Sequence, residues 1–276
     1  MQIGFIGLTH LGLNYLAATA RRNFKVYGID EDKKKIERYK TFNFDISEPK
    51  LYNFIIQNKN KINFTSNFND IKKLDLIFIS LDVETDTRGQ SEDKPLKKLI
   101  KKIKKYSKSN AELVILSQVK PGFTRKINFF KRKIYYQVET LIFGEAVDRA
   151  NKPERIIVGL ERKDTSLGKY YKKFLKSFKC PILKMNYESA ELTKITINIF
   201  LASSVTVSNA IARLCKQISA NWFDIVPALK LDKRIGPYAY TKPGLGISGG
   251  NLERDLFTAK ILANKDKYSL NLINSF

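Results

Sequence analysis

Residues 3–12, IGFIGLTHLG, decide the fold of this 276-residue chain. A short apolar strand leads directly into a helix here. Gly7 and Gly12 take the first and third places of a G-x-G-x-x-G turn, and Thr9 takes the second. Asp30 directly follows the next apolar run, KVYGI. Its separation from the glycine turn is that of the acid that binds the ribose hydroxyls of NAD in this motif. The combination predicts dinucleotide-binding architecture.

The rest of the chain continues this pattern as far as Met185. The apolar runs LDLIFISL, ELVILSQV, IIVGLE and PILKMN have strand length, and helical segments lie between them. This alternation predicts an α/β fold with a Rossmann-type parallel sheet covered on both faces. Residues 188–220 then read as one long helix without Gly or Pro. We therefore expect a dinucleotide-binding domain over 1–185 and a helical domain over 186–276.

The side chain of Thr9 is expected to hinder cofactor binding. The second glycine of the motif lets the backbone approach a pyrophosphate. A β-branched residue narrows that approach and disfavours φ > 0. On this reasoning Thr9→Gly should strengthen NAD binding, and it stays open at this point whether the turn holds NAD.

Composition excludes several classes of site. The chain has a single histidine, His10, which argues against most zinc sites and any Ser-His-Asp arrangement, so no metal site is expected. Cys180 and Cys215 lack paired spacing, which fits a reducing cytoplasm. The N-terminus MQIGFIG lacks the features of a signal peptide, and no apolar run reaches the roughly 18 residues of a membrane span. We expect a cytoplasmic protein.

The formal net charge of +23 has two interpretations. It is typical of a nucleic-acid or anionic-surface binder, but also of a lysine-rich composition. In residues 97–108, KKLIKKIKKYSK, the apolar residues recur at helical spacing, so the lysines occupy the solvated face of an amphipathic helix. The solvated-face interpretation is favoured, and nucleic acid is not the expected partner.

Nine stretches, in order from Gly4 to about Leu256, resemble the UDP-glucose/GDP-mannose dehydrogenase family, whose members oxidise a nucleotide sugar at C6 with two NAD. They are IGFIGLTHLG, YGIDEDKKKI, SEPKL, LIFISLDVETDTRG, SQVKPGFTRKI, YQVETLIFGEAV, NKPERIIVGLE, ESAELTKITINIFLASSVTVSNAIARLCKQISA and LDKRIGPYAYTKPGLGISGGNLERDL. The last two are the most specific. The chain stops about where the family's third domain would begin.

The resemblance implies roles for individual residues. The catalytic residues would be Lys194, Asn198, Asp255 and Glu139. The NAD-binding residues would be Gly7, Thr9, Gly12, Asp30 and Thr85. A nucleotide sugar such as UDP-glucose would meet Arg234, Gly244, Gly246, Gly249 and Gly250.

Four positions depart from the family pattern. Asn251 stands where the family has its nucleophilic cysteine, and Gln118 replaces a threonine that positions water. Phe143 replaces a second glutamate, and Val83 replaces a threonine beside the cofactor. An amide has no accessible anion and cannot form a thioester. The hydrolytic half of the reaction is therefore expected to be lost, while alcohol-to-aldehyde oxidation needs only groups that the chain retains.

Three functions stay open on these observations. The first is an NAD-linked oxidoreductase on a nucleotide sugar that is impaired in full four-electron oxidation. The second is a catalytically inactive nucleotide-sugar-binding or scaffold homologue. The third is a basic nucleic-acid or anionic-surface binder.

The long helix also predicts self-association. Its apolar residues cover more than one stripe: Leu192, Ile195, Ile199, Phe200, Leu201, Val205, Val207, Ile211, Leu214 and Ile218. A helix that packs on one side needs only one apolar face. The resembling family pairs this helix in dimers, so we expect a homodimer through 188–220, with Arg234 near the partner's pocket.

Overall fold

The computed structural model describes residues 1–83, 92–128, 132–244, 250–264 and 266–276. These residues form two compact units, and the described parts of the first are 1–83 and 92–194. The second runs from Ile195 to Phe276. Each unit is described by itself below.

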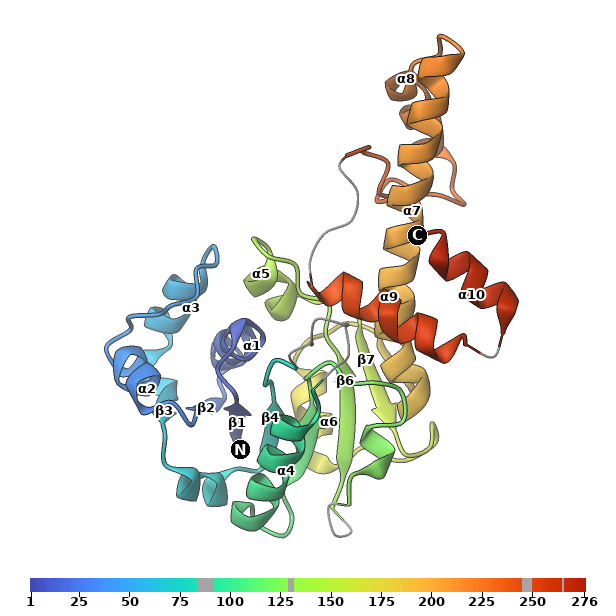
Figure 1. Cartoon of the computed structure of the whole chain (residues 1–276). Coiled ribbons are helices and arrows are strands. Elements are labelled where there is room, and N and C mark those ends of the chain that lie inside the picture. The colour runs from blue at the N-terminus through green and yellow to red at the C-terminus, as the bar shows by residue number, and fades with distance from the viewer. Residues whose placement is uncertain (84–91, 129–131, 245–249, 265) are drawn as a thin grey trace. The chain divides into compact units, whose positions relative to one another are not determined.

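The first unit is built on an eight-stranded sheet with the order β3-β2-β1-β4-β5-β6-β7-β8 (Figure 1). The strands are β1 Gln2–Ile6, β2 Lys25–Ile29, β3 Ile62–Thr65, β4 Leu76–Ile79, β5 Glu112–Ile115, β6 Ile134–Val138, β7 Ile156–Leu160 and β8 Ile182–Asn186. The order reverses between β1 and β4, which is the position where doubly wound sheets open a crevice for ligands. The α/β Rossmann-type prediction is confirmed.

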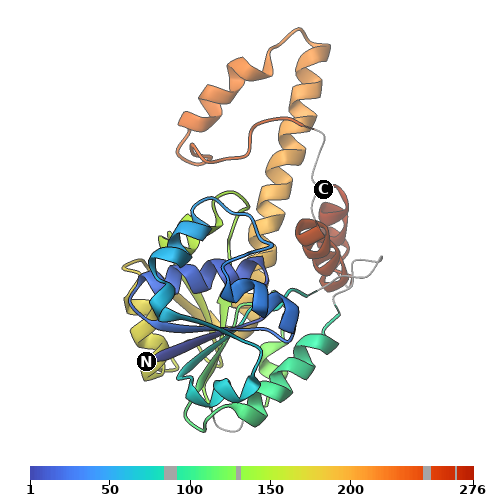
Figure 2. The same ribbon diagram turned by 90° about the vertical axis from the view of Figure 1, so that its left-hand side faces the viewer.

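Helices cover both faces of the sheet, because alternate strand residues point to opposite sides (Figure 2). On one face Phe5 and Phe78 stack beneath α1 His10–Arg21, and α6 Lys169–Lys176 packs on the same core. On the other face Ile77 and Ile115 pack against α4 Lys94–Tyr106. The other helices of this unit are α2 Lys33–Lys40, α3 Leu51–Gln57 and α5 Ala146–Asn151, with short 3-10 turns at Lys59–Lys61, Phe68–Lys73 and Thr124–Lys126.

The lysine-rich segment forms the amphipathic helix expected of it. In α4, Leu96 and Ile103 are fully buried, and Lys98 and Lys101 are exposed. Pro95 lies in the first turn, where its missing N–H costs nothing. The solvated-face interpretation of this lysine run is thereby supported.

The prediction of a wholly parallel sheet was wrong at one position. β6 and β7 pair antiparallel, with Gln137 opposite Val158. Neither β6 nor β3 was among the strands identified from the sequence. Whether two strands pair parallel or antiparallel depends on the end of the sheet at which the connecting segment re-enters it. The apolar pattern within a strand is the same in both cases. The pattern therefore predicted strands without predicting this reversal.

The long helix α7 runs from Tyr187 to Gln217, close to the predicted 188–220. It is the one helix of the described residues that is long and apolar enough to cross a membrane by length and composition, which the sequence reading did not anticipate. A helix that packs against protein meets the same criteria, so this property alone assigns no membrane.

The second unit adds α8 Trp222–Leu231, α9 Gly250–Leu262 and α10 Lys267–Asn274 to α7. Side chains of α7 and α8 anchor the segment before α9. The Ser208 hydroxyl donates to the Tyr240 carbonyl (2.9 Å), and the Trp222 indole N–H donates to the Thr241 carbonyl (2.9 Å).

Candidate active site

Gly7 and Gly12 form a close-packed turn between β1 and α1. Gly7 has φ +90°, and a Cβ atom there would lie 2.9 Å from the Leu81 backbone nitrogen. A Cβ atom on Gly12 would lie 2.2 Å from the Gly7 carbonyl oxygen and 2.5 Å from Ser80 Oγ. The Ser80 hydroxyl donates to that same carbonyl oxygen (2.8 Å). Both positions therefore require glycine, as a turn built for close backbone approach does.

Thr9 adopts a conformation that corrects our first argument about it. Its φ is −79° with extended ψ, so the left-handed backbone that threonine was expected to resist is absent. Its hydroxyl donates to the Ser80 carbonyl oxygen (2.8 Å). Thr9→Gly would remove this bond without relieving backbone strain. The expectation that this substitution strengthens NAD binding loses one of its two reasons, the backbone argument, and the steric argument stays a prediction.

Asp30 lies at the end of β2, beside the same turn. Its carboxylate accepts hydrogen bonds from the backbone N–H groups of Leu8 (2.9 Å) and Asp32 (3.1 Å). Lys35 Nζ lies 3.6 Å from Oδ2, and the Asp30 side chain is 17% exposed. An acid held at this place, still partly open to solvent, is what recognition of ribose hydroxyls requires.

His10 begins α1 and forms a cluster that the sequence reading missed. Its Nε2 lies 2.7 Å from Oε1 of Glu48, a side chain that is almost fully buried. Glu48 also accepts from the Gly144 backbone N–H (3.0 Å). Burial opposes ionisation of Glu48, but the bonds from His10 and Gly144 hold its pKa below the ordinary value. The exposed Phe143 ring packs against the His10 ring at a tilt of 36°, with 4.3 Å between ring centroids. Glu48 lies between α2 and α3, where no local sequence pattern marks it as a site residue.

Asp82 follows β4 on the same side of the sheet and was also missed. Asp82 is exposed at the surface, yet desolvation by the surrounding atoms raises its pKa, whereas a hydrogen bond with the Thr9 side chain and the nearby His10 lower it. The neighbouring Val83 is 7% exposed. The sequence signal was an acid three residues beyond the buried strand LIFI, at the sheet edge that carries the glycine turn.

Glu139 and Lys194 form an ion pair with 3.0 Å between Oε1 and Nζ. Their side chains are only 14% and 10% exposed. Glu139 also accepts from the Leu141 backbone N–H (3.0 Å). Three residues before Lys194, the buried Glu191 accepts from the backbone N–H of Thr124 (2.8 Å), and burial raises its pKa. α7 is thereby fixed to the loop after β5, which sets the position of the lysine.

The second unit holds Asn198 and Asp255. The Asn198 amide donates to Asp255 Oδ2, and Asp255 is 2% exposed. Arg254 Nε lies 3.7 Å from Oδ1 of the same carboxylate. A buried carboxylate held by an amide and a guanidinium is a fixed hydrogen-bond acceptor.

Of the expected substrate residues, Gly244 and Arg234 are described. The Gly244 N–H donates to Asn209 Oδ1 (2.9 Å), and Arg234 pairs with Asp232 at 2.5 Å while its side chain is 89% exposed. Gly250 and Asn251 begin α9. Thr85, Gly246 and Gly249 lie outside the described residues.

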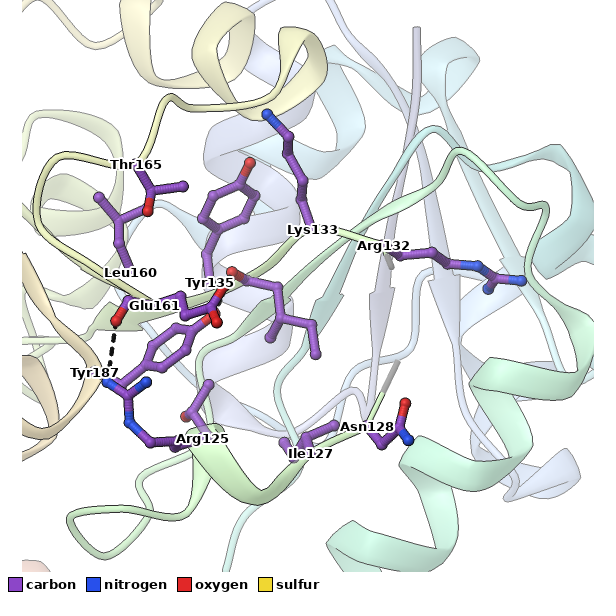
Figure 3. A pocket seen from close by; sticks show the side chains of 12 residues that line it. Arg125, Ile127, Asn128, Arg132, Lys133, Tyr135, Leu160, Glu161, Thr165 and Tyr187 are labelled. Carbon is purple, nitrogen blue, oxygen red and sulfur yellow. Dashed lines mark hydrogen bonds between the residues drawn. The ribbon is translucent and has the colours of Figure 1, made fainter. Parts of the chain in front are cut away.

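A pocket of about 420 Å³ lies away from the glycine turn, at the start of β6 (Figure 3). It is lined by basic side chains, among them Arg125, Arg132 and Lys133. Arg125 is bound to Glu188 and donates to the Glu161 carbonyl oxygen (3.0 Å), and Lys133 donates to the Ser166 carbonyl oxygen (3.1 Å). These cations are largely engaged in holding the wall of the pocket together.

A second pocket, of about 560 Å³, lies within the second unit. Asn209, Arg213, Lys216 and Trp222 line it together with Gly244, the described beginning of the glycine-rich stretch. Arg213 and Lys216 make the lining of this pocket basic. Across the described part of the chain, no group of three or more His, Cys, Asp or Glu side chains could hold a metal ion.

Two family models match successive parts of this chain. The NAD binding domain of the UDP-glucose/GDP-mannose dehydrogenase family matches residues 1–179, and the central domain of that family matches 188–276. The chain belongs to the UDP-glucose/GDP-mannose dehydrogenase family. The NAD binding domain coincides with the unit that carries the Gly7–Gly12 turn and Asp30.

Relatives within the family are longer than this chain. It is 27% identical to a UDP-glucose 6-dehydrogenase of Rickettsia prowazekii, covering 100% of this chain and 65% of the relative. It is 29% identical to an uncharacterised protein of Methanocaldococcus jannaschii, covering 92% of this chain and 30% of that protein. The chain thus spans less than two thirds of either relative.

Solved structures share the fold of both units. A UDP-glucose dehydrogenase from Pyrobaculum islandicum matches with a TM-score of 0.89 and 21% identity, over 99% of this chain and 66% of that one. A GDP-mannose dehydrogenase from Pseudomonas aeruginosa matches with a TM-score of 0.79 and 20% identity, over 100% and 67%. At these identities the likeness establishes the fold.

Proposed function

We propose that this chain is an NAD-linked oxidoreductase on a nucleotide sugar that carries out the first, two-electron oxidation and not the second. Two observations carry this proposal: the retained polar residues are held in two side-chain pairs, and the residue at the expected nucleophile position is changed. Lys194 with Glu139, and Asn198 with Asp255, keep the residues expected for alcohol oxidation. Position 251 has asparagine.

In the proposed reaction each retained residue has a role. Gly7, Gly12 and Asp30 would hold the pyrophosphate and ribose of NAD, which supplies the hydride acceptor when bound. The Asp255 carboxylate would accept the proton of the C6 hydroxyl as the hydride leaves. Lys194 and Asn198, one helical turn apart in α7, would stabilise the developing oxyanion. Glu139 and Asp255 would hold those two side chains in place. The glycine-rich stretch and Arg234 would bind the sugar nucleotide.

Calorimetric titration with NAD and with UDP-glucose tests the proposal. Saturable binding of both ligands to the purified chain, with reduction of NAD when both are present, is the expected result. Binding of NAD with no NADH formation against any UDP-hexose would contradict the catalytic part. Binding of neither ligand would contradict the whole proposal.

A non-catalytic nucleotide-sugar binder is the second candidate. It is favoured by the fact that Lys194, Asn198, Asp255 and Arg234 all have side-chain partners within the chain. Residues retained for stability would have these same contacts. The two candidates differ in one result, since only the enzyme forms NADH.

We also predict a homodimer through α7. In the single chain Phe200 is 70% exposed, Val207 58% and Leu214 46%. Burial of each large apolar side chain contributes on the order of 1.5–3 kcal/mol, and salt screens all but nearby charges of the +23 chain. Light scattering after size exclusion should give a dimer at micromolar protein. Phe200→Asp with Val207→Asp should give monomer, whereas Tyr52→Asp, at an exposed ring of α3, should not. A monomeric mass for the unchanged chain would refute the dimer.

A further inference from the structure

Glu48 is a buried carboxylate that joins two segments lying far from it in the sequence. Its Oε1 lies 2.7 Å from Nε2 of His10, the first residue of α1. The backbone N–H of Gly144 donates to both of its oxygens, at 3.0 Å and 3.1 Å. Beside Gly144, the Phe143 ring packs against the His10 ring. The start of α1 and the segment around Gly144 are therefore fastened to each other through one carboxylate.

Gly144 belongs to the connection between β6 and α5, and this connection begins with Glu139. Glu139 forms the ion pair with Lys194, with 3.0 Å between Oε1 and Nζ. The connection is thus held at two places, by Lys194 through Glu139 and by Glu48 through Gly144. If the bond to Glu48 is lost, the end of the connection away from Lys194 loses its carboxylate anchor, and the position of Glu139 is less well defined.

The glycine turn has bonds of its own that do not involve Glu48. The Leu8 backbone N–H donates to Asp30 (2.9 Å), and the Thr9 hydroxyl donates to the Ser80 carbonyl oxygen (2.8 Å). Loss of the Glu48 carboxylate should therefore leave the turn in place and loosen the connection after β6. The two effects can be measured separately.

We propose that Glu48 is a positioning residue for the oxidation. It ties the connection that carries Glu139 to the start of α1, and so keeps the Glu139–Lys194 pair at a fixed place relative to the glycine turn. Glu48 contacts neither substrate nor cofactor in this proposal and acts through Glu139. The inference rests on the proposed function, because it gives the pair a role in alcohol oxidation. A misplacement of about 1 Å in such a group can cost about 100-fold in rate.

Substitution of Glu48 should lower the rate of NADH formation from NAD and UDP-glucose without weakening the use of NAD. Glu48→Leu keeps most of the volume and removes the acceptor, and Glu48→Ala also admits water to the Gly144 N–H. In each, kcat should fall at least about tenfold, whereas the KM for NAD should change by less than about threefold. Glu48→Gln keeps an oxygen that can accept from Gly144 and should recover most of the rate.

Asp75→Asn is the matched control. Asp75 also accepts from a backbone N–H, that of Gln2 (2.8 Å), and also pairs with a side-chain cation, Lys108. It directly precedes β4, so it lies at the end of the sheet away from the glycine turn. Its variant should keep the kcat and KM of the unchanged chain. Thermal unfolding of every variant identifies those that are folded.

Hydrogen exchange measured by mass spectrometry gives a second readout, which needs neither NAD nor substrate. In Glu48→Leu and Glu48→Ala, peptides over 139–147 should exchange at least about tenfold faster than in the unchanged chain, because a hydrogen bond to a charged acceptor is lost. Peptides over 2–13 should keep their rate, since the turn retains its own bonds. Glu48→Gln should show a smaller effect than either.

A double-mutant cycle distinguishes positioning from a general loss of stability. Glu139→Gln should lower kcat by itself. If Glu48 acts through Glu139, adding Glu48→Leu to Glu139→Gln should lower kcat by less than about twofold more, because the group that Glu48 positions is already changed. A purely structural contribution of Glu48 would lower kcat by the same factor in both backgrounds.

The outcomes separate this inference from the proposed function. A fall in kcat that disappears in the Glu139→Gln background, together with faster exchange of 139–147, supports the inference. Unchanged kcat in the folded Glu48 variants overturns it and leaves the proposed function standing, as does an equal fall in both backgrounds. Exchange of 139–147 at the unchanged rate overturns it whatever the activity. Absence of NADH with the unchanged chain overturns the proposed function and, with it, the role of Glu48 in the reaction.

Discussion

The chain should form no UDP-glucuronate from UDP-glucose and NAD at a turnover typical of its family. Conversion of the aldehyde to the acid in this family passes through a thioester, and the amide of Asn251 cannot supply a thiolate. We expect carboxylate formation at least about 10³-fold below that of a full-length UDP-glucose 6-dehydrogenase, the scale of loss when a nucleophile is removed. Mass spectrometry of the products under saturating NAD is the measurement.

The two cysteines of the chain provide the control for that experiment. Cys215 is buried in α7, whereas Cys180, before β8, is partly exposed. Burial raises the pKa of the Cys180 thiol, which lowers its thiolate fraction. Cys180→Ser and Cys215→Ser should leave the product pattern unchanged. Asn251→Cys should raise carboxylate yield if Gln118 and Phe143 do not limit the hydrolysis. Carboxylate at enzyme-like turnover in the unchanged chain would contradict the prediction.

Gly12→Val should abolish NAD binding and destabilise the first unit. The new side chain would meet the Gly7 carbonyl oxygen, a backbone atom, at 2.2 Å, and the turn cannot move without separating β1 from α1. Overpacking of this severity costs about 2–4 kcal/mol in the free energy of unfolding. Urea unfolding followed by tyrosine fluorescence and circular dichroism measures the loss, and calorimetry measures NAD binding.

Gly244→Ala is the matched control for this substitution. No atom lies within 4 Å of the Cβ position there, and the alanine N–H can still donate to Asn209. Its unfolding free energy and NAD affinity should equal those of the unchanged chain. If Gly12→Val unfolds at the same urea concentration as Gly244→Ala, the turn is not the rigid element described above.

Local order along the chain predicted most of the architecture. The sequence displays directly those features that depend on neighbouring residues. They include the apolar runs of strand length, the spacing of the glycines in the first turn and the helical period of 97–108. For this reason α4 and α7 were predicted close to their observed bounds, and β1 was predicted to lead directly into a helix. The family membership was also predicted, from ordered motifs.

Contacts between residues that are far apart in the sequence could not be predicted from such local patterns. Asp82 and Glu48 were not singled out from the sequence, and His10 was noted only as the single histidine. The three residues come together because the segment after β4, the segment before α3 and the start of α1 meet at one edge of the sheet. The backbone of Thr9 likewise depends on its bond to Ser80, seventy-one residues further along the chain.

The sequence by itself determined the alternation of strands and helices with the exception of β3 and β6, the turn between β1 and α1 and the family of this protein. Only the tertiary structure decided the antiparallel β6–β7 pair, the conformation of Thr9 and the partners of Lys194 and Asp255. The physical reason is that propensity and apolar period act within a few residues of the chain. Strand direction, burial of a carboxylate and its hydrogen-bond partners depend on which distant segments are packed together.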